Sequence, residues 1–213
     1  MVTDTTTSTG PGRAPGTKDP KVAGVLLAAG GGRRLGGRPK ALLGHRGRPL
    51  IEHAVRSLRN GGCGPLHVVL GAAADEVRAR AELTGCAVSV NPDWEEGMGS
   101  SLRLGLAALS AADADAALVL LVDQPGIGPE AVARVRLAYR SRTSLAAASY
   151  GGVRSHPVLF GVDRWPDVAA AAVGDRGART YLREHRDAIT LVECADVAEA
   201  YDIDTAEDLG RLE

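Results

Sequence analysis

A glycine-rich, cationic segment of the sequence has the composition of a phosphate-binding loop. Gly30, Gly31 and Gly32 follow an apolar run, and Arg34 and Lys40 lie within the next eight positions. Glycine allows backbone N–H groups to approach phosphate oxygens closely, and cationic side chains neutralise phosphate charge. The segment lacks the G-x-x-x-x-G-K-[ST] pattern of P-loop proteins and the third glycine of a dinucleotide-binding fingerprint. Its glycines alone therefore leave two interpretations open, a phosphate cradle and a cationic surface loop without a ligand.

The distribution of lysine favours the first interpretation. Of the 25 lysine and arginine residues three are lysines: Lys18 and Lys21 lie near the N-terminus, and Lys40 lies inside the expected domain. Lysine carries a compact charge that can follow a phosphate through changing geometry, whereas a guanidinium requires a planar, forked partner. We therefore expect Lys40 to contact a phosphate.

Short apolar runs alternate with amphipathic segments from residue 22 onward, which is typical of crossover units on a parallel sheet. Gly151 and Gly152 separate two late strands and permit a tight hairpin, so one element is antiparallel. The sequence predicts an α/β fold: a single Rossmann-like three-layer domain whose twisted sheet is mostly parallel. Ligands are expected outside the carboxyl ends of the strands, after residues 29, 91, 122 and 193. The expected strands are 22–29, 66–70, 87–91, 116–122, 144–150, 157–160 and 189–193, and the expected helices are 49–60, 73–83, 98–109, 129–140, one near 168, 178–185 and a last one from 205.

Length and composition favour one globular domain and exclude several function classes. The 213 residues are 45% hydrophobic and 24% charged, which is ordinary for a soluble fold. A net charge of −1 gives no basis for binding nucleic acid or a membrane surface, and no apolar run is long enough to span a membrane. The three cysteines are odd in number and far apart, so we expect neither a disulfide framework nor a thiolate metal site, and a cytoplasmic location. Residues 1–21 are expected to form a flexible tail, and residues 22–213 the folded domain.

Five further motifs follow the glycine-rich loop, which reads L-A-A-G-G-G-R-R-L-G-G-R-P-K. They are N-P-D-W-E-E-G-M-G-S-S-L at 91–102, D-Q-P at 123–125, H-P at 156–157, G-D-R-G-A-R at 174–179 and D-I-D-T at 202–205. In this order they resemble the motifs of the MobA-like nucleotidyltransferases, and in particular those of the molybdenum cofactor cytidylyltransferase branch. The resemblance spans residues 22–209. Gly32, Leu35 and Ser155 depart from the family pattern, which more often has Ser or Thr, Met and Gly at these positions.

The resemblance implies transfer of a nucleotidyl group, in which a phosphate oxygen attacks the α-phosphorus of a nucleoside triphosphate and pyrophosphate leaves. Because two anions must meet, catalysis depends on positioning, on cationic side chains and on Mg²⁺. We expect Lys40 to contact the α-phosphate and Arg34 the β- and γ-phosphates. Asp123 and Asp204 are expected to bind Mg²⁺, which prefers oxygen ligands and retains several waters. Two alternatives stay open: Asp123 is a turn former before Gln-Pro, and Asp204 is a helix cap.

The family also implies which residues contact the two substrates. The related guanylyltransferases carry glycine at the position of Ala29, so its methyl group is expected to narrow the base site and favour CTP over GTP. The terminal phosphate of a molybdopterin-type cofactor is expected over the N-terminus of the helix 98–109. His156 is alternatively a structural histidine. The expected nucleotide-binding residues are Leu27, Ala28, Ala29, Gly30, Gly31, Gly32 and Asn91, and the expected acceptor-binding residues are Gly97, Met98, Ser100, Ser101 and His156.

Three functions are compatible with these residues. The favoured hypothesis is Mg²⁺-dependent transfer of CMP from CTP to molybdopterin, with a molybdoenzyme as the recipient of the product. A nucleotidyltransferase that acts on a sugar or alcohol phosphate would use the same nucleotide-binding half. A non-catalytic carrier of the cofactor would need no metal at the α-phosphate, and the combination of Lys40, Asp123 and Asp204 argues against it.

Overall fold

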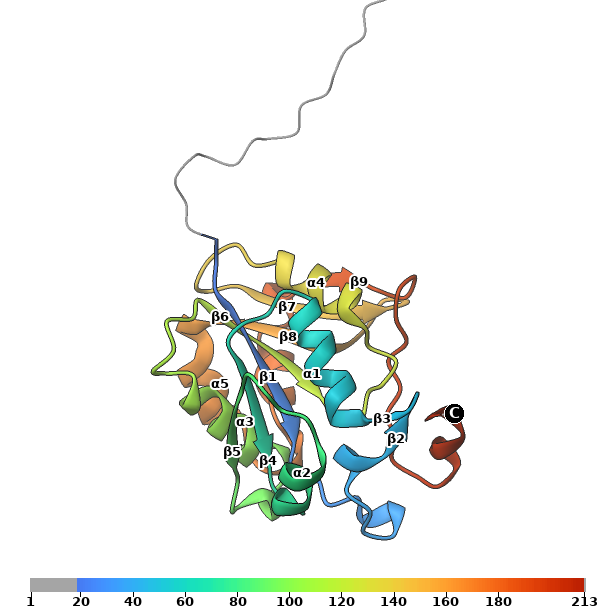
Figure 1. Ribbon diagram of the computed structural model, residues 1–213. Coiled ribbons are helices and arrows are strands. Elements are labelled where there is room, and N and C mark those ends of the chain that lie inside the picture. The colour runs from blue at the N-terminus through green and yellow to red at the C-terminus, as the bar shows by residue number, and fades with distance from the viewer. Residues whose placement is uncertain (1–18, 213) are drawn as a thin grey trace, which may run out of the picture.

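The computed structural model describes residues 19–212, which form one layered α/β unit around a central sheet (Figure 1). Most of the expected flexible tail falls on residues 1–18, outside the described residues. At the start of the described chain, the backbone N–H of Lys21 donates to the Asp115 carboxylate at 2.9 Å. This contact ties the N-terminal entry of the sheet to the loop that precedes a neighbouring strand.

The central sheet has seven strands in the order β5-β4-β1-β6-β8-β7-β9. All neighbouring pairs are parallel except β6 with β8 and β7 with β8, so β8 alone runs against the others. This arrangement confirms the predicted mostly parallel sheet with a late antiparallel element. The strands are β1 (Val22–Ala28), β4 (Leu66–Leu70), β5 (Cys86–Val90), β6 (Ala116–Leu121), β7 (Leu145–Tyr150), β8 (Val153–Gly161) and β9 (Thr190–Glu193).

The hairpin between β7 and β8 contains an irregularity that the sequence did not reveal. Gly151 and Gly152 have φ values of 60° and 82°, which supply the tight turn. β8 begins before the predicted start at Pro157, because three residues of the hairpin pair with β7 ahead of a β-bulge. The register passes from Ser155 directly to Val158, so His156 and Pro157 have no partner on β7. A bulge tolerates proline because no ladder hydrogen bond is required there.

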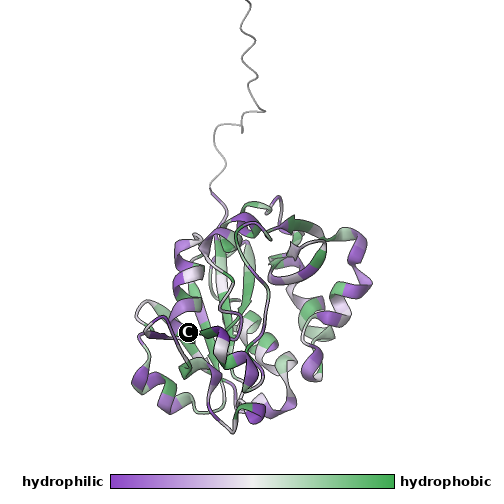
Figure 2. Ribbon diagram, turned by 90° about the vertical axis from the view of Figure 1, so that its right-hand side faces the viewer, coloured by the Kyte–Doolittle hydropathy of each residue, from purple (hydrophilic) through white to green (hydrophobic). Residues whose placement is uncertain are grey.

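Helices cover both faces of the sheet and divide the core in two. Successive residues of β1 alternate between the faces: Leu26 packs in one cluster, and Val25 and Leu27 pack in the other. Figure 2 shows the mostly hydrophobic central strands between helices that contain both hydrophobic and hydrophilic residues. The first cluster includes residues of α1 (Leu50–Asn60), α2 (Ala74–Arg80) and α4 (Pro129–Leu137), and the second includes residues of α3 (Met98–Ala108), α5 (Trp165–Ala171) and α6 (Arg179–Glu184).

Several short elements complete the fold and depart from the predicted map. A small hairpin of β2 (Gly44–His45) and β3 (Arg48–Pro49), which was not predicted, precedes α1. The predicted last helix from residue 205 is instead a 3₁₀ segment, η7 (Glu207–Leu212), and the Asp208 carboxylate accepts hydrogen bonds from the N–H groups of residues 204 and 205. The other 3₁₀ segments are η1 (Arg33–Leu35), η2 (Lys40–Leu42), η3 (Trp94–Glu96), η4 (Val162–Arg164), η5 (Gly174–Arg176) and η6 (Arg186–Ala188).

The cysteines and the apolar character of the helices complete the description of residues 19–212. Cys63, Cys86 and Cys194 are free thiols, so none forms a disulfide. Between residues 19 and 212, no helix combines the length and the apolar character that crossing a bilayer requires.

The close packing of α3 on the sheet generates the first prediction. A Cβ at Gly105 would lie 2.8 Å from Val25 Cγ1 and 3.2 Å from Val69 Cγ2. Gly105→Val should therefore lower the free energy of unfolding by about 1–3 kcal/mol, because overpacking forces the helix away from β1 and β4. Urea unfolding followed by circular dichroism measures this change. Ala107→Val, at an exposed position of the same helix, is the matched control, and an equal loss in both variants would contradict the proposed contact.

Candidate active site

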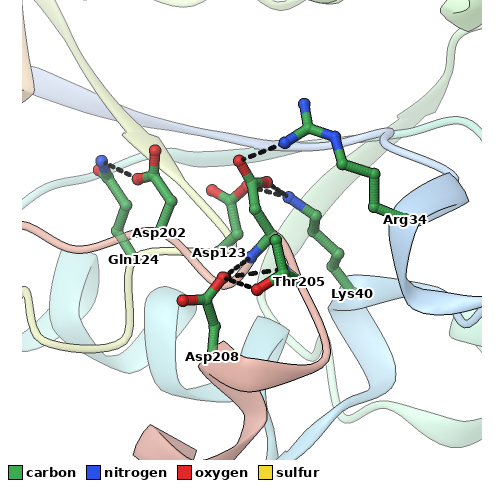
Figure 3. A network of polar contacts seen from close by, with 8 residues as sticks. Arg34, Lys40, Asp123, Gln124, Asp202, Thr205 and Asp208 are labelled. Atoms are coloured by element: carbon green, nitrogen blue, oxygen red, sulfur yellow. Dashed lines mark hydrogen bonds and ion pairs between the residues drawn. The ribbon is translucent and has the colours of Figure 1, made fainter.

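Three charged side chains from distant parts of the sequence meet at the carboxyl ends of the central strands. The Lys40 ammonium lies 2.6 Å from Asp123 Oδ2 and 2.5 Å from Asp204 Oδ1. Arg34 reaches the other oxygen of Asp204 at 3.3 Å. Figure 3 shows Lys40 pointing into this group. We call Lys40, Asp123 and Asp204 the ion cluster.

The local fold explains how the ion cluster is assembled. Asp123 follows the buried strand β6, and its carbonyl oxygen accepts a hydrogen bond from the Ile203 N–H at 2.9 Å. Ile203 is fully buried, so this contact anchors the chain beside the end of β6 and directs Asp204 toward Lys40. Asp208, rather than Asp204, accepts hydrogen bonds from the backbone N–H groups of residues 204 and 205, at 3.0 Å and 2.8 Å. The carboxylate of Asp204 is therefore free of the capping role that the sequence left open.

Burial and attraction act together on the ion cluster. Burial lowers the pKa of Lys40, but the attraction of Asp123 and hydrogen bonds to both carboxylates outweigh it, so the net pKa is raised above its usual value. Burial raises the pKa of Asp123, and the Lys40 ammonium partly offsets that rise. Lys40 consequently remains a cation at neutral pH and is held where an incoming phosphate would meet it.

The glycine-rich loop presents backbone donors beside the ion cluster. Within residues 19–212, the N–H groups of Gly30, Gly31 and Gly32 donate no hydrogen bond. Gly32 has a φ of 60°, and a Cβ there would lie 2.0 Å from the carbonyl oxygen of Arg38. Its own carbonyl accepts from residues 35 and 37 at 2.8 Å and 3.1 Å, which closes the loop on itself. Glycine at position 32, unlike the Ser or Thr common in the family pattern, therefore fits this backbone without a shift.

The ion cluster and the loop line a cavity of about 530 Å³, which we call the first cavity. Arg34 is 74% exposed and points over it, while Arg33 lies 3.5 Å from Glu95 and beside Trp94. Ala28, Asn91 and Ser100 are absent from its lining. The predicted residues that do line it are Leu27, Ala29, Gly30, Gly31, Gly32, Arg34, Lys40, Gly97, Met98, Ser101, Asp123 and Asp204.

Asn91 has a positioning role in place of the expected contact with nucleotide. Its amide is buried and donates to Ser100 Oγ at 2.8 Å and to Ser101 Oγ at 3.0 Å. Ser100 in turn donates to the carbonyl groups of Asp93 and Gly97, each at 2.9 Å. With these contacts satisfied, Asn91 and Ser100 are not directed at a ligand but fix the first turn of α3. The sequence could not distinguish these two roles, because both require a polar side chain after a strand.

The N-terminus of α3 differs from the expected open phosphate site. Asp175, on η5, approaches it so closely that a Cβ at Gly97 would lie 2.4 Å from Asp175 Oδ1. Gly97 has a φ of 111°, and this conformation together with the missing side chain admits η5. The helix N-terminus already has an internal carboxylate beside it, whose negative charge opposes the approach of a phosphate.

A second cavity of about 180 Å³ adjoins the first and contains His156. Leu27, Met98 and Asp202 are among the residues that line both cavities, so the two spaces share a wall. The β-bulge of β8 displaces His156 from the sheet ladder toward this space. His156 is thus separated from Gly97 and Ser101, with which it was grouped as an acceptor-binding residue.

Several charged and polar residues of these cavities were not among the predicted site residues. Gln124 donates from Nε2 to Asp202 Oδ1 at 2.7 Å, and Arg179 lines both cavities. Gln124, Asp202 and Arg179 lie in the motifs D-Q-P, D-I-D-T and G-D-R-G-A-R, respectively. The motifs were therefore the available signal, but only the folded chain shows which of their side chains turn inward.

The charges that line the first cavity indicate whether a divalent cation would fit there. Its lining contains four cationic side chains and five carboxylates, which leaves a net charge of −1 before any ligand binds. A nucleoside triphosphate adds further negative charge, so it requires an additional cation. No group of three or more His, Cys, Asp or Glu residues within the described chain forms a complete metal site. Two carboxylates that converge within the ion cluster nevertheless fit Mg²⁺, which takes one or two protein carboxylates together with phosphate oxygens.

The environment of His156 generates a prediction about pH. Burial lowers the pKa of His156 to about 4; Arg179 and Arg154 add to this effect, and Asp202 opposes it. Because the unfolded chain titrates near a pKa of about 6.5, it binds more protons than the folded protein between these values, and stability falls as pH decreases through this window. His156→Gln should remove about 2–3 kcal/mol of the difference in unfolding free energy between pH 7 and pH 4.5. Urea titrations at both pH values measure it, and an unchanged difference would show that His156 is not buried as a neutral ring.

Comparison with known proteins places this geometry in a family. The family described as the MobA-like NTP transferase domain matches residues 24–189. Nicotine blue oxidoreductase of Paenarthrobacter nicotinovorans is 42% identical over 200 residues, which are 91% of this chain and 97% of that protein. Molybdenum cofactor guanylyltransferase of Shewanella amazonensis is 26% identical over 196 residues, covering 90% and 95% of the two chains.

A solved structure extends the comparison to the fold and to a metal. The crystal structure of Rv0371c from Mycobacterium tuberculosis H37Rv in complex with manganese has a TM-score of 0.73 and 28% sequence identity, and the match covers 90% of this chain and 97% of that one. A protein of similar fold and sequence is thus known with a divalent metal. The family match includes the glycine-rich loop, Lys40 and Asp123, and the chain belongs to the MobA-like NTP transferase family.

Proposed function

We propose that the protein transfers CMP from CTP to the terminal phosphate of a molybdopterin-type cofactor and releases pyrophosphate. The observation that carries this proposal is the ion cluster, which places one ammonium between two carboxylates beside a loop with unused N–H groups. The motif order of the cytidylyltransferase branch and the similarity to a molybdenum cofactor guanylyltransferase support the choice of acceptor. The recipient molybdoenzyme and the cytoplasmic location stay predictions.

The arrangement of the residues supports a division of labour on the triphosphate. The N–H groups of the loop from Gly30 to Gly32 and the exposed guanidinium of Arg34 bind the β- and γ-phosphates. Lys40 binds the α-phosphate, because its compact ammonium can exchange a carboxylate oxygen for a phosphate oxygen. Asp123 and Asp204 would hold Mg²⁺, which neutralises phosphate charge and polarises the α-phosphate when it is bound. The chain thereby aligns the α-phosphorus for in-line attack by the acceptor phosphate.

Ala29 is the residue that we propose to select the base. It is 8% exposed, lines the first cavity and follows β1 directly. A Cβ at Gly71 would lie 2.8 Å from the Ala29 Cβ, so the backbone on that side leaves the Ala29 methyl no room to retreat. The methyl therefore occupies part of the base site, which favours a pyrimidine over the larger guanine.

Removal of one carboxylate of the ion cluster tests the proposed chemistry. Asp123→Asn should lower the rate of pyrophosphate release from CTP and molybdopterin by about 10³-fold, because it removes a metal ligand and the main partner of Lys40. Asp75→Asn, at an exposed position on α2 outside both cavities, is the matched control. A coupled pyrophosphate assay with Mg²⁺, and with sugar and alcohol phosphates as alternative acceptors, measures the effect. If the parent protein released no pyrophosphate from any triphosphate but still delivered the cofactor to a molybdoenzyme, the carrier hypothesis would be favoured.

The choice of base is tested by enlarging the base site. The parent protein should use CTP faster than GTP, and Ala29→Gly should shift the ratio of kcat/KM values toward GTP by about tenfold, which corresponds to about 1.4 kcal/mol. Steady-state pyrophosphate release with four nucleoside triphosphates measures the ratio. Faster turnover of GTP by the parent protein would overturn the assignment to CTP.

Oxidoreduction of a small organic compound is a second candidate function. The relative that favours it, nicotine blue oxidoreductase, shares 42% of its residues with this chain, more than the guanylyltransferase does. An assay of nicotine blue turnover, run beside the assay of pyrophosphate release, separates the two functions. Oxidation or reduction of nicotine blue, followed by its absorption, without release of pyrophosphate from any triphosphate, would favour oxidoreduction.

A further inference from the structure

The second cavity differs from the first in the sign of its charge. Its lining contains three guanidinium groups, those of Arg154, Arg176 and Arg179, and one carboxylate, that of Asp202. His156 adds no charge at neutral pH, because burial lowers its pKa to about 4. The first cavity has more carboxylates than cations, whereas the second has an excess of cations. An anion can therefore enter the second cavity without an added metal ion.

The three guanidinium groups are not neutralised by other parts of the protein. Arg154 donates to the carbonyl oxygen of Leu182 at 3.3 Å, and none of the three has a carboxylate within ion-pair distance among residues 19–212. The nearby Asp202 carboxylate accepts the hydrogen bond from Gln124. The guanidinium groups thus retain their capacity to bind a planar or tetrahedral anion through two hydrogen bonds.

Gln124 supplies an independent indication that the second cavity takes a ligand. It is 7% exposed, and its carbonyl oxygen Oε1 has no hydrogen-bond partner within the described chain. The contact with Asp202 fixes the orientation of the amide, because turning it over would place two acceptor oxygens against each other (Figure 3). A buried acceptor without a donor is costly. Because Gln124 lines the second cavity, a ligand there that carries an N–H or O–H group would satisfy Oε1 after a small shift of the side chain.

Arg179 lies where the two cavities meet, since it lines both. The N-terminus of α3, the other expected phosphate site, already has Asp175 beside it. We propose that Arg179 holds the phosphate of the acceptor at this junction, and that Arg154, Arg176 and Gln124 bind the rest of an anionic acceptor bearing a hydrogen-bond donor, without a divalent cation. This inference rests on the proposed function for the identity of the acceptor, but the binding step is separable from the transfer of CMP.

A binding experiment without nucleotide tests the inference. The probe is a fluorescent pterin that carries a phosphate on its 6-hydroxymethyl group, titrated with the full-length protein in EDTA and, separately, in Mg²⁺. We expect equal affinities in both solutions, weaker binding at higher salt, and about tenfold weaker binding of the same pterin without its phosphate. Binding that requires Mg²⁺, or that is indifferent to the phosphate, would overturn the proposal.

Variants separate the role of Arg179 from a general effect of charge. Arg179→Gln should weaken binding of the phosphorylated pterin about tenfold, as loss of a charged hydrogen-bond donor predicts. Arg183→Gln removes an exposed arginine from the same helix outside both cavities and should leave the affinity unchanged. Equal affinities of the two variants would refute the assignment. Failure of the proposed function is distinct: pyrophosphate release would be absent while the pterin phosphate still bound.

Discussion

The site depends on one buried interaction, in which a single ammonium is shared by two carboxylates. The side chains of Lys40 and Asp123 are 14% and 19% exposed, so both charges are largely removed from water, which costs several kcal/mol per ion unless hydrogen bonds compensate. Two short contacts to Lys40 provide that compensation. Because Asp204 lies 164 residues after Lys40, the same contacts join the loop after β1 to the C-terminal segment. The segments that form the rim of the first cavity are therefore held to one another by these contacts.

The two cavities lie beside different kinds of strand: parallel strands beside the first, and the reversed strand β8 with its β-bulge beside the second. The parallel strands β1 and β6 end together and present the ion cluster at one edge of the sheet. β8 runs in the opposite direction beside β6, so an undisturbed ladder would have placed its residues alternately in the two cores. The bulge at His156 and Pro157 interrupts that alternation and opens the space that becomes the second cavity. The reversed strand thus contributes part of the wall of the second cavity, including His156.

Local patterns of the sequence were sufficient to predict the fold class and the strands of the main sheet, but they predicted the contacts of the site only in part. The short apolar run of β1 and the continuously apolar run of β6 predicted strands of a mostly parallel sheet, because hydrophobicity is a local property. From the order of the motifs we predicted that Lys40, Asp123 and Asp204 lie together at the carboxyl edge of the sheet. It could not show that the Asn91 amide donates its hydrogen bonds to two serine hydroxyl groups, or that Asp175 approaches the N-terminus of α3. Both features depend on contacts between separate segments. Gln124 was overlooked for the same reason, as its partner Asp202 lies 78 residues away.

The opposite charges of the two cavities have a consequence for the order in which ligands are bound. The net negative charge of the first cavity disfavours a bare triphosphate, so under the proposed function the nucleotide would enter together with a divalent cation. The second cavity attracts an anion by itself, and its guanidinium groups are available in the absence of nucleotide. Arg179 and Asp202 belong to both linings, which means that charge introduced on one side alters the field on the other. If the proposal holds, an acceptor phosphate at Arg179 would screen that guanidinium from the triphosphate, and Lys40 and Arg34 would be the cations left to bind the triphosphate.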